Sequence, residues 1–402
     1  MLKYLFYTCI AILSLGQLTA VSKTGETSLY LFDPAIAGFS LVGLFYFLAI
    51  KKSLSIPRYF YFFLLFTVIA AMSLVYSLDR LNGREFLLSS FYLLRWIFYL
   101  VSAIVVFNMF EQKMLTVIEV VTSLILSGIL ITLAGFAQLI ILPDFENLRP
   151  ELGWDPHKNR LASTFFDPNF TGAYLVSVLI LLFEFHNNLF LRFKDNVRQI
   201  ILYSASVLFT VALVLTFSRS SWAMMSVVVL IYGVLRYRHL LLLAFLIAFL
   251  AYFAVPRVQT RISGTTDPAD SAQYRFISWN NTLKITEDNL ITGVGFNAYR
   301  YVQRDYGYLT PDTFEGHSGA GSDSSILFVL ATTGLFGLTT FVLGLVFPVA
   351  DYFFKKRKLN ILMITLIGGL LVHSLFVNSL FYPQIMFLWS TMFGVSNYLL
   401  RT

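Results

Sequence analysis

The stretch "FLLSSFYLLRWIFYLVSAIVVF", residues 86–107, contains a single charged residue, Arg95, near its middle. A helix needs about 20 mostly apolar residues to cross the hydrocarbon core of a membrane, and this stretch is long enough. Inside the membrane no water is available to hydrogen-bond with backbone groups, so a crossing segment satisfies them within a helix. The stretch therefore predicts a transmembrane helix that carries one buried arginine.

Similar apolar stretches recur along the whole chain of 402 residues. Hydrophobic residues make up 57% of it and charged residues only 13%, which is about half the charged fraction of a soluble protein. We therefore predict an all-α polytopic membrane protein, folded as a single transmembrane domain over residues 1–402. Twelve spans are expected, at residues 4–20, 29–50, 59–78, 86–108, 114–142, 169–184, 199–217, 220–235, 240–256, 323–350, 359–379 and 383–400.

The loops between these spans differ in charge. One set holds most of the lysines and arginines, including Lys51, Lys52 and "KKRK" at 355–358. The other set is poor in them except in two long loops, 143–168 and 257–322, where acidic residues accompany the basic ones. Cytoplasmic loops of membrane proteins are enriched in Lys and Arg. We therefore expect both termini in the cytoplasm and both long loops outside it, and no nucleic-acid partner for the net charge of +7.

An alternative for the N-terminus is a cleaved signal peptide. Lys3, the apolar run 4–18 and "LTA" at 18–20 provide its three parts. A first transmembrane helix is the preferred interpretation, because cleavage would disturb the alternation of charge between the loops.

Motifs for bound cofactors are missing from the sequence. The five histidines, at 157, 186, 239, 317 and 373, do not have the spacing of metal ligands. There is no P-loop and no dinucleotide-binding motif. We therefore predict that no metal, nucleotide or other cofactor is used. The single cysteine, Cys9, has no second cysteine in the sequence to pair with.

Arginines and aromatic residues mark the predicted outer ends of the spans. In "LTFSRSSW", 215–222, Arg219 lies between two apolar runs, where a guanidinium is costly unless an anion meets it. The alternative is an arginine that reaches out to the membrane surface. In the outer loop, Arg275 and Trp279 share one face of a predicted helix over 267–285, as suits a diphosphate and a sugar ring. An amphipathic helix on the membrane surface is equally compatible with this pattern.

Further polar residues follow in and near the loops. His157 and Arg160 precede a helix start at Asp167–Pro168–Asn169, and they either contribute to an anionic site or are solvated. Arg300 ends "ITGVGFNAYR", 291–300, whose two glycines permit a close backbone approach.

Two polar residues lie within the spans themselves. Arg95 serves either to lock helices together or to contact substrate, and we expect no acidic partner for it in any span. His373 is interpreted as a hydrogen-bonded core histidine. Together, the outward features predict a site for an anionic amphiphile whose polar part lies outside the membrane.

The order of these motifs resembles that of the O-antigen ligase and polymerase superfamily. The resemblance rests on "RLASTFFDPNFTGAYL", "LTFSRSSW", "YRFISW", "LITGVGFNAYR" and "HSGAG…LFVLATTGLFGL", which cover about residues 150–340. It implies a GT-C-like, metal-independent membrane glycosyltransferase. Such an enzyme takes a glycan from undecaprenyl diphosphate on the outer, periplasmic face of the bacterial cytoplasmic (inner) membrane. The implied partners are this donor, a glycan or glycolipid acceptor such as the lipid A core or another lipid-linked repeat unit, and membrane lipids.

The resemblance also implies roles for particular residues. Arg219 and Arg275 match family arginines that bind the diphosphate, and Trp279 matches the loop tryptophan. Arg160 and Arg300 are further candidates for substrate binding. The acceptor is left open between lipopolysaccharide ligation, polysaccharide polymerisation and protein O-glycosylation. The alternatives from other classes are a flippase for lipid-linked oligosaccharides and a non-catalytic scaffold of the cell envelope.

The candidate catalytic base departs from the family pattern. The family's histidine precedes "TG..G" at the place that Asp323 occupies here, and His317 lies six residues earlier. Both groups can accept a hydroxyl proton. We favour His317, because an aspartate would need a raised pKa and nearby arginines would lower it. Asp323 would then orient the histidine or the acceptor. The plainer alternative is that Asp323 only caps the helix that follows.

Overall fold

The structure is a computed structural model that describes all residues except 25–26, 146–156, 265–270, 310–320, 356–360 and 402. Long helices account for most of it, and a small antiparallel hairpin, β1 (Ala20–Thr24) and β2 (Thr27–Tyr30), follows the first of them. The helices are α1 (Leu2–Leu15), α2 (Phe32–Phe45), α3 (Tyr61–Tyr76), α4 (Gly83–Glu111), α5 (Val117–Ile141), α6 (Pro168–Phe185), α7 (Asp195–Leu215), α8 (Arg219–Leu235), α9 (His239–Ala254), α10 (Pro256–Ser263), α11 (Ser271–Asp288), α12 (Tyr299–Asp305), α14 (Ser325–Lys355), α15 (Ile361–Phe376) and α16 (Pro383–Leu399).

The prediction of an all-α polytopic membrane protein is confirmed. Within the described part of the chain, eight helices are long and apolar enough to cross a membrane, and a ninth span results if α9 and α10, which meet at a bend of 99°, are taken together. The helices α8 and α15 are shorter but apolar. Each of the twelve predicted spans overlaps a helix, although the number of crossings stays a prediction.

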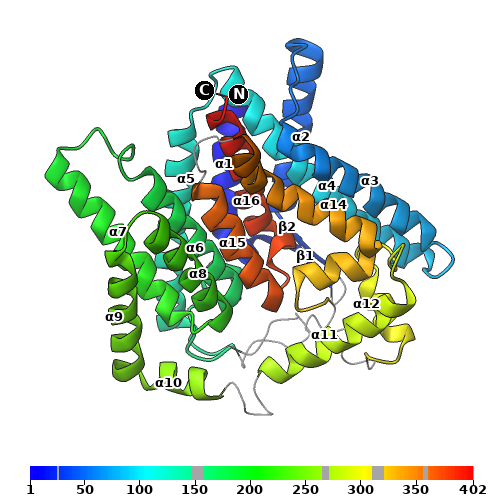
Figure 1. The fold of residues 1–402 in the computed structure, drawn as a ribbon. Helices are drawn as coiled ribbons and strands as arrows, with labels where there is room; N and C mark the ends of the chain where they lie inside the picture. The colour runs from blue at the N-terminus through cyan, green and yellow to red at the C-terminus, as the bar shows by residue number, and fades with distance from the viewer. Residues whose placement is uncertain (25–26, 146–156, 265–270, 310–320, 356–360, 402) are drawn as a thin grey trace.

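The helices form a bundle with two different ends. Figure 1 shows the two termini close together at one end and the helices α10 and α11 across the other end. Large rings fill the interior, where Trp96 of α4 packs against Phe63 of α3, Phe341 of α14 and Trp389 of α16. In contrast, α9 has no buried residue at all and packs mainly on α8. Its apolar surface therefore faces lipid.

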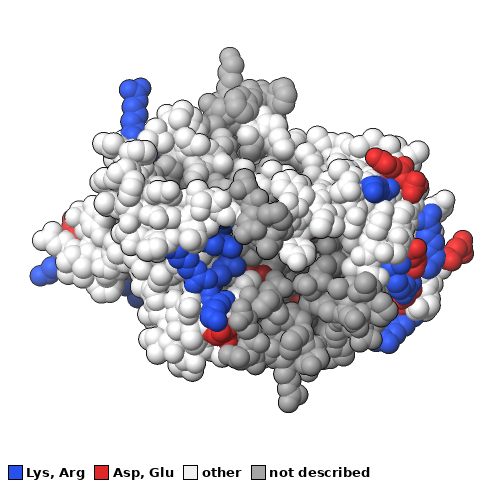
Figure 2. Space-filling model, turned by 90° about the horizontal axis from the view of Figure 1, so that it is seen from below, with Lys and Arg blue, Asp and Glu red and all other residues white. Residues whose placement is uncertain are grey.

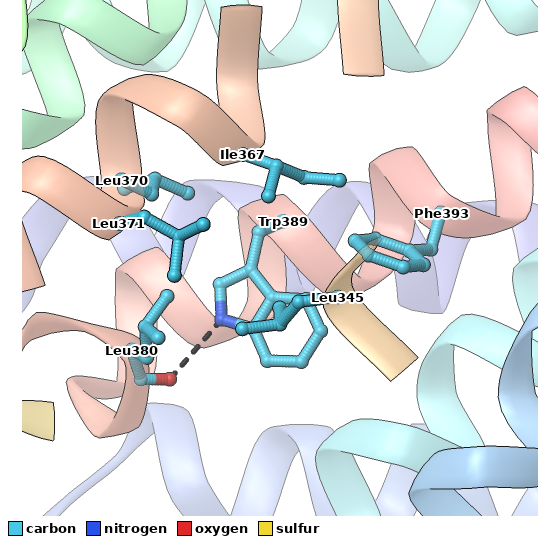
Figure 3. Close-up of a pocket in the computed structure, with 7 residues that line it drawn as sticks. All are labelled: Leu345, Ile367, Leu370, Leu371, Leu380, Trp389 and Phe393. Atoms are coloured by element: carbon cyan, nitrogen blue, oxygen red, sulfur yellow. Dashed lines mark hydrogen bonds between the residues drawn. The ribbon is translucent and has the colours of Figure 1, made fainter. Parts of the chain in front are cut away.

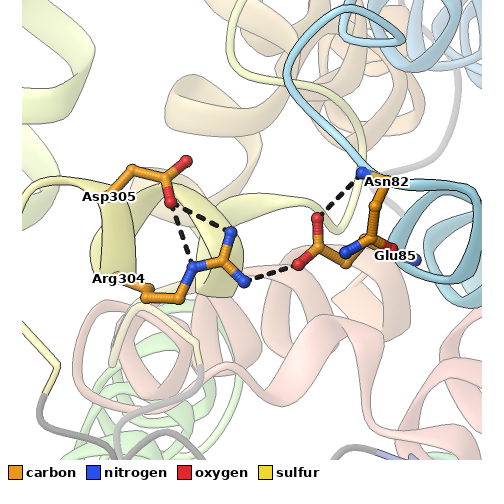
Figure 4. A network of polar contacts seen from close by, with 4 residues as sticks. All are labelled: Asn82, Glu85, Arg304 and Asp305. Carbon is orange, nitrogen blue, oxygen red and sulfur yellow. Dashed lines mark hydrogen bonds and ion pairs between the residues drawn. The ribbon is translucent and has the colours of Figure 1, made fainter.

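The described part of the long loop 257–322 is attached near the end of α3 and at the start of α4. Asn82 and Glu85 form a capping box at the start of α4, and Glu85 also accepts a hydrogen bond of 2.5 Å from Arg304 of α12 (Figure 4). Arg304 in turn pairs with Asp305 at 3.0 Å, and Arg80 donates to Asn289 at 2.6 Å. These contacts hold the second half of the loop against the bundle.

A break in α14 receives the glycine-rich stretch of the loop. Gly334 has φ 67° and ψ −171°, which interrupts the helix, and a Cβ there would lie 2.0 Å from the Ile291 carbonyl oxygen. The freed backbone groups are paired, because Leu335 N donates to Leu290 O and Val294 N donates to Ala331 O. The two glycines at 293 and 295 therefore serve the close backbone approach that the sequence predicted.

The interior also contains a small apolar cavity. Its volume is about 10 Å³, and it is lined by Leu345, Ile367, Leu370, Leu371, Leu380, Trp389 and Phe393 (Figure 3). The indole Nε1 of Trp389 is already bonded to Leu380 O at 3.1 Å. A lining without free polar groups does not hold water, so this cavity is a packing void rather than a functional site.

The expectation that Arg95 has no acidic partner in the spans is wrong. Asp33, in the first turn of α2, accepts a hydrogen bond of 2.7 Å from Arg95 Nη2 and one of 3.1 Å from Tyr99 OH. The guanidinium also lies over the ring of Tyr92, 4.8 Å from its centroid. The sequence argument overlooked Asp33 because it lies close to the edge of a predicted span. Arg95 therefore joins α4 to α2.

Replacing either member of this pair by leucine, Asp33→Leu or Arg95→Leu, should destabilise the protein by about 3–5 kcal/mol, because each change leaves a buried charge without its partner. The double variant should recover much of the loss. The measurement is thermal unfolding of the purified protein in detergent. Single variants as stable as the wild type would show that the pair does not hold the two helices together.

Candidate functional site

The starts of α6 and α8 meet at the end of the bundle that α10 and α11 cover. Asp167 caps α6 by accepting a hydrogen bond of 2.6 Å from Asn169 N, and Ser218 caps α8 by accepting one of 3.3 Å from Ser221 N. Ser218 Oγ donates to Asn169 Oδ1 at 2.8 Å, which joins the two starts. The approach is close, because a Cβ at Gly172 would lie 2.3 Å from Ser221 Oγ. Both helix dipoles thus direct their positive ends to the same place.

The loop before α6 is held on the turn between α7 and α8 by arginines. Arg160 donates from Nε to Thr216 O at 2.9 Å and from Nη2 to Phe217 O at 3.3 Å. Arg257 of α10 donates to Asn159 O at 2.7 Å and lies over the ring of Phe217, 4.7 Å from its centroid. The bend between α9 and α10 therefore brings a basic helix over the start of α8.

Further arginines gather around this point. Arg219, the first residue of α8, donates to the carbonyl of Arg261 on α10 at 3.4 Å. The pKa of Arg160 is lowered to about 9, first by burial and then by the positive charge of Arg261, with Arg257 and Arg275 acting in the same direction. Such effects require the guanidinium groups to lie near one another. We call Arg160, Arg219, Arg257, Arg261 and Arg275 the arginine cluster.

The arginine cluster and the ionisable groups around it have a net positive charge. Asp167 is the carboxylate that acts on Arg160 in the opposite direction. His157 adds no charge near neutral pH, because burial and the neighbouring Arg160 and Arg261 lower its pKa to about 4 against the opposing effect of Asp167. Figure 2 looks onto the end of the molecule formed by α10 and α11 and shows basic side chains gathered left of the centre of this face. An anion bound there would relieve the repulsion.

Asp323 lies beside the arginine cluster, just before α14. Two residues of α11 fix its backbone: Ser278 Oγ accepts from Asp323 N at 3.1 Å, and Trp279 Nε1 donates to Asp323 O at 3.4 Å. Burial raises the pKa of the Asp323 carboxyl to about 6, although Arg275 acts to lower it and Asp167 acts to raise it. Arg275 therefore lowers the pKa of Asp323, as the sequence predicted, but burial raises it by more.

The structure brings most of the predicted site residues together. Arg275, Trp279 and Asp323 meet where α11 crosses the start of α14, and Arg219 and Arg160 belong to the arginine cluster. Asp323 does not act as the cap that the alternative interpretation assigned to it, since Ser324 Oγ accepts the hydrogen bond from Leu327 N at 3.4 Å. His317 lies outside the described residues. Arg300 is buried at the start of α12, and its part in the site stays a prediction.

Sequence reasoning missed two members of the arginine cluster, Arg257 and Arg261. The sequence did contain a pattern that indicates them. Both follow Pro256, at which a helix can begin, and their spacing of four residues places them on one face of that helix. What the sequence did not indicate was the 99° bend that turns this helix over the start of α8.

Fold and site together define a polytopic membrane protein with a basic end at which helices begin. The described residues contain no group of three or more His, Cys, Asp or Glu side chains that could hold a metal ion.

Residues 204–342 match the model of the O-antigen ligase family, and this match supports the resemblance to the O-antigen ligase and polymerase superfamily. The matched segment contains Arg219, Arg275, Trp279 and Asp323. No curated protein matches the chain. The match supports a glycosyltransferase-like activity of the O-antigen ligase or polymerase type at the inner membrane.

Replacing Asp323 by asparagine should change the dependence of stability on pH. The carboxyl has a pKa of about 6 in the folded chain and about 4 in an unfolded one, so its ionisation favours unfolding. The wild type should lose stability relative to Asp323→Asn as the pH rises from about 4 to 6, and the difference should then stay constant. Melting temperatures of both proteins across this range test the prediction. A difference that does not change with pH would contradict the raised pKa.

Proposed function

We propose that the protein transfers a glycan from undecaprenyl diphosphate to an acceptor hydroxyl on the outer face of the inner membrane. The observation that carries this proposal is the arginine cluster, which places excess positive charge beside a carboxyl group of raised pKa. A lipid diphosphate has the matching charge, and its apolar chain has a place in the surrounding membrane. The acceptor hydroxyl belongs to the lipid A core, to another lipid-linked repeat unit or to another envelope glycan.

The reaction replaces one bond at the anomeric carbon of the donor sugar by another. The acceptor oxygen bonds to this carbon, the bond from the carbon to the diphosphate oxygen breaks, and undecaprenyl diphosphate leaves with the electron pair. Negative charge grows on the diphosphate during this step. Arg219 and Arg275, with Arg160 beside them, are proposed to bind the diphosphate and to stabilise that charge. Guanidinium groups provide this without a metal ion.

The proton of the acceptor hydroxyl needs a base near the arginine cluster. Asp323 is proposed for this role, because its carboxyl is partly buried, its pKa is raised to about 6, and the described residues donate no hydrogen bond to it. A carboxyl group with that pKa is ionised at neutral pH and is a stronger base than an ordinary aspartate. His317, favoured from the sequence, is the competing candidate.

Trp279 lies between Asp323 and Phe376 and offers a face for a sugar ring.

The orientation follows from charge. The lysine-rich and arginine-rich loops predict cytoplasmic termini, and Figure 1 shows the termini at the end of the bundle opposite α10 and α11. The arginine cluster then opens to the periplasm, where lipid-linked glycans are assembled in this family.

Arg219→Ala and Arg275→Ala should each lower kcat on the order of 100-fold to 1,000-fold, as expected for the loss of one group that stabilises charge in the transition state. The assay is in vitro transfer from an undecaprenyl diphosphate glycan to supplied acceptors, with EDTA present. The matched control is Arg236→Ala. Arg236 follows the opposite end of α8 and pairs with Glu184 at 2.9 Å, partly exposed, so its loss should leave transfer unchanged. Full activity of both site variants would contradict the proposed diphosphate site.

Asp323→Asn and His317→Ala separate the two candidate bases. If Asp323 takes the proton, only Asp323→Asn should lose about 100-fold or more in kcat, and wild-type kcat/KM should fall as the pH drops below about 6. If His317→Ala alone is inactive, the histidine is the base. Full activity in both variants would remove this stretch from the chemistry.

A further inference from the structure

The buried histidine His373 is a titratable side chain in this region that the proposed chemistry does not use. It lies on α15 and is completely buried. Its Nε2 is 3.2 Å from Ser220 Oγ and 3.4 Å from Ser221 Oγ, the two residues that follow Arg219 on α8. Its Nδ1 has no hydrogen-bond partner in the described part of the chain.

The contacts of the ring decide which nitrogen carries the proton. A neutral imidazole has one N–H, and a buried N–H without an acceptor is costly. Acceptors are present at Nε2 and not at Nδ1. The proton is therefore assigned to Nε2, and the nearer of its two hydroxyl neighbours, Ser220 Oγ at 3.2 Å, is taken as the acceptor.

This assignment sets the direction of the neighbouring hydrogen bonds. Asn169 Oδ1 can only accept, so Ser218 Oγ donates to it at 2.8 Å. Ser218 Oγ can then accept from Ser220 Oγ at 3.1 Å, while Ser220 accepts from His373. The result is a one-way chain from His373 through Ser220 and Ser218 to Asn169. Ser221 Oγ adds a second bond to α6, to Asn169 O at 3.1 Å.

We propose that His373 is a positioning residue: through this hydrogen-bond chain it fixes the first turn of α8 against α6 and so holds Arg219 where the diphosphate binds. In the sequence, Arg219 lies between Ser218 and Ser220, which are the two serines of this hydrogen-bond chain. Loss of the Nε2 donor leaves Ser220 free to turn away from Ser218, and the start of α8 is then held by fewer bonds. The inference rests on the proposed function, since it assigns Arg219 to the diphosphate.

The first experiment is a double-mutant cycle in the transfer assay. His373→Leu, which removes the donor, should lower kcat roughly 10-fold to 100-fold, because small displacements of a positioned group have effects of that size. His373→Gln keeps an N–H near the place of Nε2 and should retain most of the activity. In an Arg219→Ala background, His373→Leu should cause little further loss, since it acts through Arg219.

The controls address folding. Ser374→Ala removes the hydroxyl next to His373, which among the described residues bonds within α15, to Leu371 O at 2.8 Å, and the variant should keep full activity. Ser220→Ala interrupts the chain with little change in volume, so it tests the inference if His373→Leu does not fold. An equal loss from His373→Leu with and without Arg219, or full activity of Ser220→Ala, would overturn the inference.

A binding measurement separates this inference from the proposed reaction. Undecaprenyl diphosphate without a glycan should raise the melting temperature of the wild type, and Arg219→Ala and His373→Leu should both lose this increase. If the wild type transfers no glycan but shows this pattern, the reaction is wrong and the positioning role stands. If His373→Leu keeps the full increase while Arg219→Ala loses it, the positioning role is wrong.

Discussion

The hydrogen bond from Ser218 to Asn169 joins the starts of α6 and α8, and the arrangement of the site depends on it. Helix starts carry unpaired backbone N–H groups and partial positive charge. Two of them placed together favour an anion, and arginines on the neighbouring loops add full charges to the same place. The absence of a Cβ at Gly172 is what permits the approach, because any larger side chain would meet Ser221.

The rest of the structure separates rigid support from exposed surface. The rings around Trp96 and the ion pair of Asp33 with Arg95 fix the N-terminal helices, and these hold the long loop 257–322 through Glu85 and Arg304. The loop in turn fills the break of α14 at Gly334 and presents Ser278 and Trp279 to Asp323. The position of Asp323 thus depends on contacts that begin in distant helices. Elsewhere in the bundle, α9 packs mainly along α8 and presents its apolar surface to lipid before it leads into the basic α10.

Asp323 and His373 show two different uses of buried polar groups beside one site. At Asp323 burial changes the acidity of a carboxyl group, and its effect exceeds that of the nearby Arg275. At His373 burial leaves partners at Nε2 and none at Nδ1 within the described part of the chain, so the imidazole donates from Nε2. The first property suits proton transfer and the second suits positioning. Neither property is visible in the sequence, where the same residue types occur in ordinary surroundings.

The sequence by itself determined the all-α membrane fold, because long apolar stretches in a membrane have no other way to satisfy their backbone groups. It also indicated Arg219, Arg275 and Trp279, since a charge at a membrane boundary and an arginine–tryptophan pair on one helix face are local patterns. The tertiary structure alone decided the partner of Arg95, the 99° bend that brings in Arg257 and Arg261, and the contact between His373 and Ser220, whose residues are 153 positions apart. It also decided that burial outweighs Arg275 at Asp323. These features depend on which helices pack together and how deeply a group is covered, and no local pattern encodes either.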